Sequence, residues 1–287
     1  MSTSILICVI SGIFWALFDL TRKITLIHIN PKILLILFSS IQILIFFIWC
    51  VVESFFFLTP YFFSGFSLVI IGIISALLFL KSIRDSDLSL TIPLLSFSPL
   101  FSSIFSFVIL GEKLNNIQYL GVSSIIIGTL VLYSEKFEIL YIFKSINNLR
   151  NSLSAKLMLI VAFLWSLTPV LDKICLEYSS INIHGLIQSF FTAVVLLFFS
   201  KSEWKVFKKL KNKNYSLIFI TIFIGSLATI IQFYAILTNL VPIMESIKRA
   251  IGQFSAIFFG KIFFNENITK QKVLGVLIIS TGVNLLI

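Results

Sequence analysis

Long apolar runs, broken by short polar or charged segments, dominate the chain. A helix needs about 20 mostly apolar residues to cross the ~30 Å hydrocarbon layer of a bilayer. Ten stretches meet that need: 4–21, 32–52, 64–83, 87–110, 116–133, 155–173, 183–200, 215–238, 241–263 and 269–287. The runs are continuously apolar and do not alternate with period two, which favours helices over barrel strands. The pattern therefore predicts an all-α polytopic membrane protein with ten transmembrane helices.

Composition supports this fold class and narrows the function. Hydrophobic residues make up 58% of the 287 residues and charged residues 12%, and the mean hydropathy is +1.07. A soluble domain of this size could not hide so much apolar surface. Cys8, Cys50 and Cys175 have no ligand-like spacing, and no GxSxG, HExxH or Walker A motif occurs. We therefore expect no enzyme, no cofactor and no metal, and transport driven by a gradient or by exchange.

The fifth and tenth runs repeat one pattern. EKLNNIQYLGVSSIIIGTLVL begins at Glu112 and ENITKQKVLGVLIISTGVNLL begins at Glu266. One offset places Gly121 over Gly275 and Gly128 over Gly282. Each glycine pair is seven residues apart and so shares one helix face, where small residues let helices approach closely. These two helices are therefore expected to be structural, as a scaffold face or as the interface of a homodimer.

The first and sixth runs also share a sequence pattern. FWALFDLTRKI from Phe14 matches LWSLTPVLDKI from Leu164, with Lys23 over Lys173. The chain is thus predicted to contain two five-helix repeats, over 1–134 and 155–287, joined by a loop at 135–154. Because five is odd, the second repeat enters the membrane inverted, as in secondary transporters whose site lies near the midplane between the halves.

These features resemble the drug/metabolite transporter (DMT) superfamily, in its EamA-type branch. TIPLLSFSPLFSSIFSFVILGEKL (Thr91 to Leu114) resembles the fourth helix of the first EamA repeat, and SIKRAIGQFSAIFFGKIFFNE (Ser246 to Glu266) resembles its counterpart in the second. The resemblance implies transport of a small molecule but leaves the substrate open. One departure is Asn265, which stands where the first repeat has Gly111.

The basic residues predict an orientation. Of 22 Lys and Arg, 18 lie in the loops that follow odd-numbered runs, Lys113 and Lys173 lie opposite, and Lys248 and Arg249 lie inside a run. The positive-inside rule places the 18 in the cytoplasm. We therefore expect an integral protein of the bacterial inner membrane with both termini extracytoplasmic. The basic segment 200–215 is expected to lie at an anionic lipid surface, and nucleic acid is not an expected partner.

Charged residues inside the ninth run are the clearest site candidates. Glu245 lies three residues before Lys248 and four before Arg249, so it can pair with either, and Gln253 follows on the same helix. The aligned positions in the first half are leucines, so the fold itself does not require the charges. Either at least one cation lines a substrate cavity, or both snorkel to the interface. We favour Arg249 as the partner of Glu245 and Lys248 as the cavity cation.

Further candidates surround this set. Pro93, Ser96 and Pro99 of the fourth run could bend a helix and offer polar groups, or could serve only packing. Trp15 and Trp165 could belong to an interfacial aromatic belt or line the cavity. The remaining candidates are Gln232, either helix glue or a substrate contact, and Asp19, which with Glu245 is a candidate carrier of a coupling proton. His28 and His184 are expected at the interface.

The sequence is therefore interpreted as a secondary active transporter or exchanger of a small polar or amphipathic metabolite, working by alternating access. Its expected partners are that substrate, the lipid bilayer and a proton or other coupling ion. A lipid or lipid-linked headgroup flippase is the alternative, and it would require a lateral opening to lipid. A non-transporting membrane scaffold or receptor is the second, and it would require a packed centre without a polar cavity.

Overall fold

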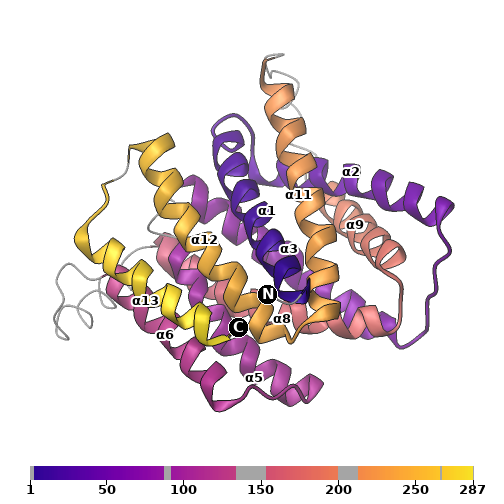
Figure 1. The fold of residues 1–287 in the computed structure, drawn as a ribbon. Helices are drawn as coiled ribbons and strands as arrows, with labels where there is room; N and C mark the ends of the chain where they lie inside the picture. The colour runs from indigo at the N-terminus through magenta and orange to yellow at the C-terminus, as the bar shows by residue number, and fades with distance from the viewer. Residues whose placement is uncertain (1–2, 87–91, 134–152, 200–212, 266, 287) are drawn as a thin grey trace.

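A computed structural model describes residues 3–86, 92–133, 153–199, 213–265 and 267–286. Within them the chain forms ten α-helices and one 3₁₀ helix (Figure 1). The elements are α1 (Thr3–Thr25), α2 (Pro31–Val52), α3 (Tyr61–Arg84), η1 (Ile92–Phe97), α5 (Ser98–Leu110), α6 (Asn116–Tyr133), α8 (Leu153–Glu177), α9 (Ile181–Phe198), α11 (Lys213–Thr238), α12 (Val241–Phe264) and α13 (Lys270–Leu286).

The chain is an all-α polytopic membrane protein. Six of the described helices are long and apolar enough to cross a bilayer by themselves: α1, α2, α3, α8, α9 and the Tyr215–Thr238 part of α11. Helix α12 has comparable length but carries four charged residues: Glu245, Lys248 and Arg249 in its first half, and Lys261 in its last turn. Such charges are costly in hydrocarbon, so α12 needs protein partners on the face that carries them.

The two halves are similar and pack reciprocally. Helix α1 packs against α11 and α12 of the second half, and α8 packs against α3, η1 and α5 of the first. The remaining large contacts join equivalent elements: α2 with α9, α6 with α13, and α12 with α5 and η1. A two-fold axis that exchanges the halves produces this pattern, so the predicted inverted repeat is confirmed.

The fourth run is not one continuous α-helix, which corrects the prediction for residues 87–110. Residues 87–91 lie outside the described part, residues 92–97 form η1, and α5 supplies only 13 residues of α-helix. Pro99 stands in the first turn of α5, where its missing N–H costs nothing. In one continuous α-helix Pro99 would instead leave the carbonyl of Leu95 without its N–H donor, which explains why regular α-helix begins only at Ser98.

Helices α6 and α13 lie side by side and meet through their glycines (Figure 1). A Cβ on Gly121 would stand 2.7 Å from the carbonyl oxygen of Gly282, and one on Gly275 would stand 2.6 Å from that of Gly128. The glycine faces are therefore buried within one chain. The homodimer expected through these helices stays a prediction, and it would have to use their other faces.

The turn at the end of α5 recurs at the end of α12 despite the departure in sequence. Gly111 and Asn265 both adopt left-handed backbone conformations, with φ of 69° and 53°. Asparagine tolerates this region better than most side chains do. The exchange therefore leaves the repeat's turn intact.

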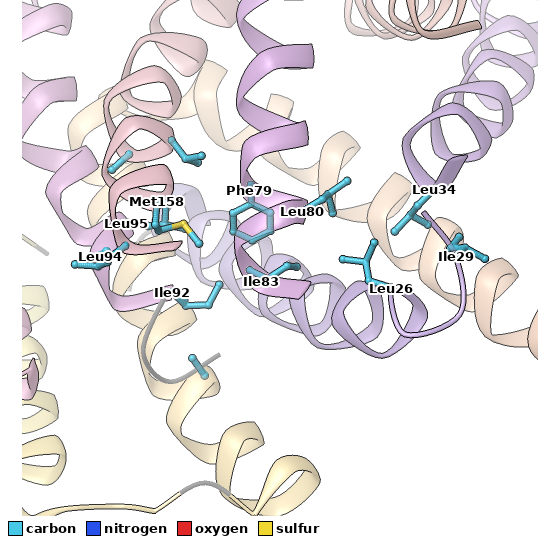
Figure 2. Close-up of a cluster of buried hydrophobic side chains, with 14 of the residues drawn as sticks. Leu26, Ile29, Leu34, Phe79, Leu80, Ile83, Ile92, Leu94, Leu95 and Met158 are labelled. Carbon is cyan, nitrogen blue, oxygen red and sulfur yellow. The ribbon is translucent and has the colours of Figure 1, made fainter. Parts of the chain in front are cut away.

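A cluster of buried apolar side chains joins the first half to α8 (Figure 2). It includes Phe79 of α3, Met158 of α8, and Leu94 and Leu95 of η1. Leu94 and Leu95 occupy the repeat positions of Lys248 and Arg249, and each is 1% exposed. At these two repeat positions, the first half therefore has buried leucines and the second half has charged side chains.

Candidate functional site

A cavity of about 250 Å³ lies between the two halves. Eight of the described elements contribute to its wall: α1, α2, α3 and η1 from the first half, and α8, α9, α11 and α12 from the second. Nearly half of the lining residues have polar or charged side chains. A central polar cavity of this kind distinguishes the molecule from a packed scaffold.

Lys248 and Arg249 of α12 both line the cavity, and both pair with Glu245. The Lys248 ammonium contacts Glu245 Oε1, and an Arg249 Nη2 lies 3.0 Å from Glu245 Oε2. Arg249 Nε also donates to Ser98 Oγ at 2.9 Å, and this hydroxyl donates to Glu245 Oε2 at 3.1 Å. Glu245 itself is fully buried and lies outside the cavity wall.

This arrangement differs from the expectation that Arg249 alone pairs with Glu245 while Lys248 alone faces the cavity. The pair of Arg249 with Glu245 is present, but Lys248 shares the same carboxylate and does not stand alone. The reason is helical spacing: residues three and four positions after Glu245 lie on its side of the helix, and its two oxygens can serve one cation each. Neither cation snorkels away, because Lys248 is 8% exposed and lines the cavity.

The two tryptophans cover these cations from opposite repeats. The Lys248 ammonium lies 5.7 Å from the ring centre of Trp15, and the Arg249 guanidinium lies 5.3 Å from that of Trp165. Both rings line the cavity, which favours cavity lining over an interfacial belt. The Trp15 indole Nε1 is buried and has no hydrogen-bond partner, so it is a donor that a bound molecule could satisfy.

Asp19 pairs with Arg22 on the same helix, and both line the cavity. The Arg22 guanidinium also lies 4.1 Å from the Phe79 ring centre and 4.5 Å from that of Phe18. Arg22 is 5% exposed, so counting it among the loop charges was wrong. Helix α1 continues to Thr25, past the predicted end at residue 21, and carries the pair into the bundle.

The cavity wall holds a second acidic group, which was not among the predicted site residues. Asp172 lines the cavity, and its Oδ1 lies 3.1 Å from Nε2 of His184. His184 is fully buried between helices, in the first turn of α9, and its expected position at the membrane interface stays a prediction. The one available signal was the repeat, since the alignment that places Lys23 over Lys173 also places Arg22 over Asp172. The contact with His184 joins separate helices and left no local pattern.

The other predicted candidates divide into two groups. Gln232 lines the cavity and accepts a hydrogen bond of 2.9 Å from Lys248 Nζ. Ser96 and Gln253 are fully buried outside the wall, and neither amide atom of Gln253 has a hydrogen-bond partner. Pro99 is buried in α5, also outside the wall. Pro93 belongs to η1, and its side chain lies outside the described part of the structure.

Comparison with known proteins assigns the family. The profile of the EamA-like transporter family matches residues 2–134 and again residues 152–287. The chain belongs to the EamA-like transporter family. One solved structure, titled only as the crystal structure of a protein, superposes on this EamA-like chain with a TM-score of 0.68 at 14% identity. That alignment covers 99% of this chain and 98% of the other, and it shows a shared fold. No curated protein matches the sequence.

Membership makes this EamA-like protein a membrane transporter of the DMT type. Several contacts join the two repeats at one end of the bundle. Glu112, just after α5, pairs with Lys173 of α8 at 2.5 Å and accepts from the backbone N–H of Val241 at 2.9 Å. Lys173 also donates to the carbonyl of Asn239 at 2.9 Å. Glu112 thus connects the segment between α5 and α6 of the first repeat to two helices of the second.

Loop contacts strengthen the same end of the EamA-like bundle. The loop between α2 and α3 pairs with the loop between α8 and α9, through the N–H of Leu58 to the carbonyl of Tyr178 and the N–H of Ser180 to the carbonyl of Phe56. These bonds measure 2.9 and 3.1 Å. The two halves are therefore joined at this end.

Proposed function

We propose that the protein is a secondary active transporter, or exchanger, of a small molecule that combines an anionic group with an apolar part. The observation that carries this proposal is the cation pair Lys248 and Arg249 in the wall of a cavity between two inverted repeats. Transport would proceed by alternating access, as the halves rock about the cavity.

The charge balance of α12 supports an anionic ligand. Two cations share the one carboxylate of Glu245, so the cluster keeps one positive charge that the helix itself does not neutralise. A buried charge is expensive unless it is paired. A carboxylate or phosphate in the cavity would compensate it, and the planar guanidinium of Arg249 suits either group.

The aromatic rings support an apolar part in the ligand. Trp15 and Trp165 stand beside the two cations, and Phe18, Phe38 and Phe233 also line the cavity. Small-molecule sites commonly combine such apolar walls with a few polar groups that fix orientation. The cavity is therefore suited to an organic anion better than to a bare inorganic one.

Uptake by the purified protein in liposomes tests the proposal. A panel of labelled organic acids, amino acids, sugar phosphates and neutral analogues is offered to the wild type and to Lys248→Ala. Loss of a hydrogen bond to a charged group costs about 1.5–3 kcal/mol, or about 10–100-fold in rate or affinity. We expect Lys248→Ala to lose uptake of the anionic substrate by about this factor, and Lys248→Arg to retain its binding.

Lys81→Ala is the matched control, because Lys81 is exposed at the end of α3. Wild-type uptake by correctly folded Lys248→Ala would overturn the role given to Lys248. Movement of fluorescent headgroup-labelled lipid, with no uptake of any panel compound, would instead identify a flippase.

A further inference from the structure

A coupled transporter needs a group that binds the coupling ion, and three carboxylates adjoin the described part of the cavity. Asp19 is paired with Arg22, and Glu245 is paired with Lys248 and Arg249. Protonating either acid would leave buried cations without a countercharge, which is costly. Both were expected from the sequence as proton carriers, and their contacts make them poor ones.

Asp172 differs because its partner is an imidazole. Its Oδ1 lies 3.1 Å from His184 Nε2, while the residue also lines the cavity. Imidazole is the side chain whose proton exchanges most readily near neutral pH. Among the described carboxylates of the cavity wall, Asp172 therefore offers a place where a proton can be gained and lost without breaking a salt bridge to Lys or Arg.

A chain of hydrogen bonds fixes how the imidazole is oriented. Gln188 Nε2 donates to the carbonyl of Gly65 and to the Tyr61 hydroxyl oxygen, at 3.0 Å each. The one hydroxyl proton of Tyr61 is then available for His184 Nδ1, 2.9 Å away. Neutral His184 consequently carries its own proton on Nε2 and donates it to Asp172.

We propose that the Asp172–His184 pair is the proton-binding site that couples transport to a proton gradient, an inference that rests on the proposed function. A proton that enters from the cavity reaches the carboxylate of Asp172. It is held on the second carboxylate oxygen of Asp172, while Oδ1 keeps accepting from the Nε2–H of His184. The pair then changes from a net charge of −1 to neutral, and no bond between heavy atoms forms or breaks.

The position of the pair explains how a proton would affect the substrate. Asp172 lines the same cavity as Lys248 and lies near enough to act on its charge. A negatively charged pair repels a substrate anion beside Lys248, and a neutral pair does not. Proton and anion would thus favour each other's binding, and such coupling between two sites is reciprocal.

The groups around the pair are few in the described structure. Tyr61 faces it from α3, Lys248 from α12, and the thiol of Cys175 from α8 itself. Helix α11 presents the Phe233 ring, 4.8 Å from the imidazole centre, and Phe46 of α2 packs against Gly185. The apolar rings shield His184 on those sides and leave the cavity as the route for a proton.

Nuclear magnetic resonance of the histidine side chains tests the pair without any substrate. The chain has two histidines, so His28→Gln leaves His184 as the sole ¹⁵N-histidine signal in protein held in lipid nanodiscs. We expect this signal to shift as the pH is lowered over the range in which the protein stays folded, because protonating Asp172 weakens the acceptor of the Nε2–H. An unchanged signal over that range would reduce the pair to a tether between α8 and α9 and overturn the proposal.

Asp172→Asn separates proton binding from tethering, because the amide oxygen can still accept from Nε2. The pH-dependent change of the His184 signal should be lost in this variant, whereas a mere tether predicts the same behaviour of the signal in both proteins. With the substrate from the uptake panel, Asp172→Asn should keep exchange and lose proton-driven accumulation; accumulation equal to wild type would also overturn the coupling role. The spectra need no substrate, so they can fail or succeed independently of the proposed function.

Discussion

At the scale of single residues, Glu245 is the group on which the cavity charges depend. It is fully buried and is the counter-ion of both Lys248 and Arg249. Removing one partner of a buried ion pair costs about 3–5 kcal/mol. We therefore expect Glu245→Gln to lower the thermal unfolding midpoint of the detergent-purified protein strongly, as followed by loss of the monodisperse peak in size-exclusion chromatography.

Two further variants make this expectation specific to charge. Ser98→Ala removes hydrogen bonds of the same cluster but no charge, so its midpoint should fall less. Adding Lys248→Gln to Glu245→Gln restores the net charge of the wild-type cluster and should recover part of the loss. A Glu245→Gln protein that melts with the wild type would show that the two cations are not desolvated.

At the scale of elements, the contact between α6 and α13 depends on the absence of side chains. A Cβ on Gly275 would stand 2.6 Å from the Gly128 carbonyl oxygen and 2.7 Å from Leu132 Cβ, and the backbone oxygen cannot move aside. Gly275→Ala should therefore push the helices apart and lower the unfolding midpoint. Gly72 of α3 has nothing within 4 Å of such a Cβ, so Gly72→Ala should leave the midpoint unchanged or raise it slightly. Equal midpoints for the two variants would contradict this account of the contact.

Most elements could be predicted from the sequence because hydropathy and the repeat report the same boundaries. Nine of the ten runs agree with the described helices to within four residues at each end. The exception is the fourth, where two prolines divide the run into η1 and α5. Proline indicates where a regular helix is interrupted, but no local pattern indicates that residues 92–97 form a 3₁₀ helix.

At the scale of the whole molecule, the part of the site carried by one helix was predictable and the part between helices was not. The spacing of Glu245, Lys248 and Arg249 predicted an ion pair because helix geometry alone brings them together. The contact of Asp172 with His184 arises only when α8 and α9 are packed. The inverted repeat explains why α1 and α8 face one cavity, but it predicts equivalent positions and not the chemistry placed there.

At the same scale, we predict the orientation of the molecule in the membrane from the distribution of Lys and Arg residues that no acid neutralises. Arg22 is no longer counted among the cytoplasmic loop charges because it is buried and paired with Asp19. Lys173 is no longer counted on the opposite side because Glu112 neutralises it. The excess at the end that holds Lys81, Lys261 and Lys270 therefore persists, and the positive-inside rule predicts that this end lies in the cytoplasm. A fluorescent protein fused after Ile287 should stay dark while alkaline phosphatase fused there is active, and fusions near Lys208 should behave in the opposite way. Fluorescence at the C-terminus would reverse the orientation and would place the end that Glu112 and Lys173 join in the cytoplasm.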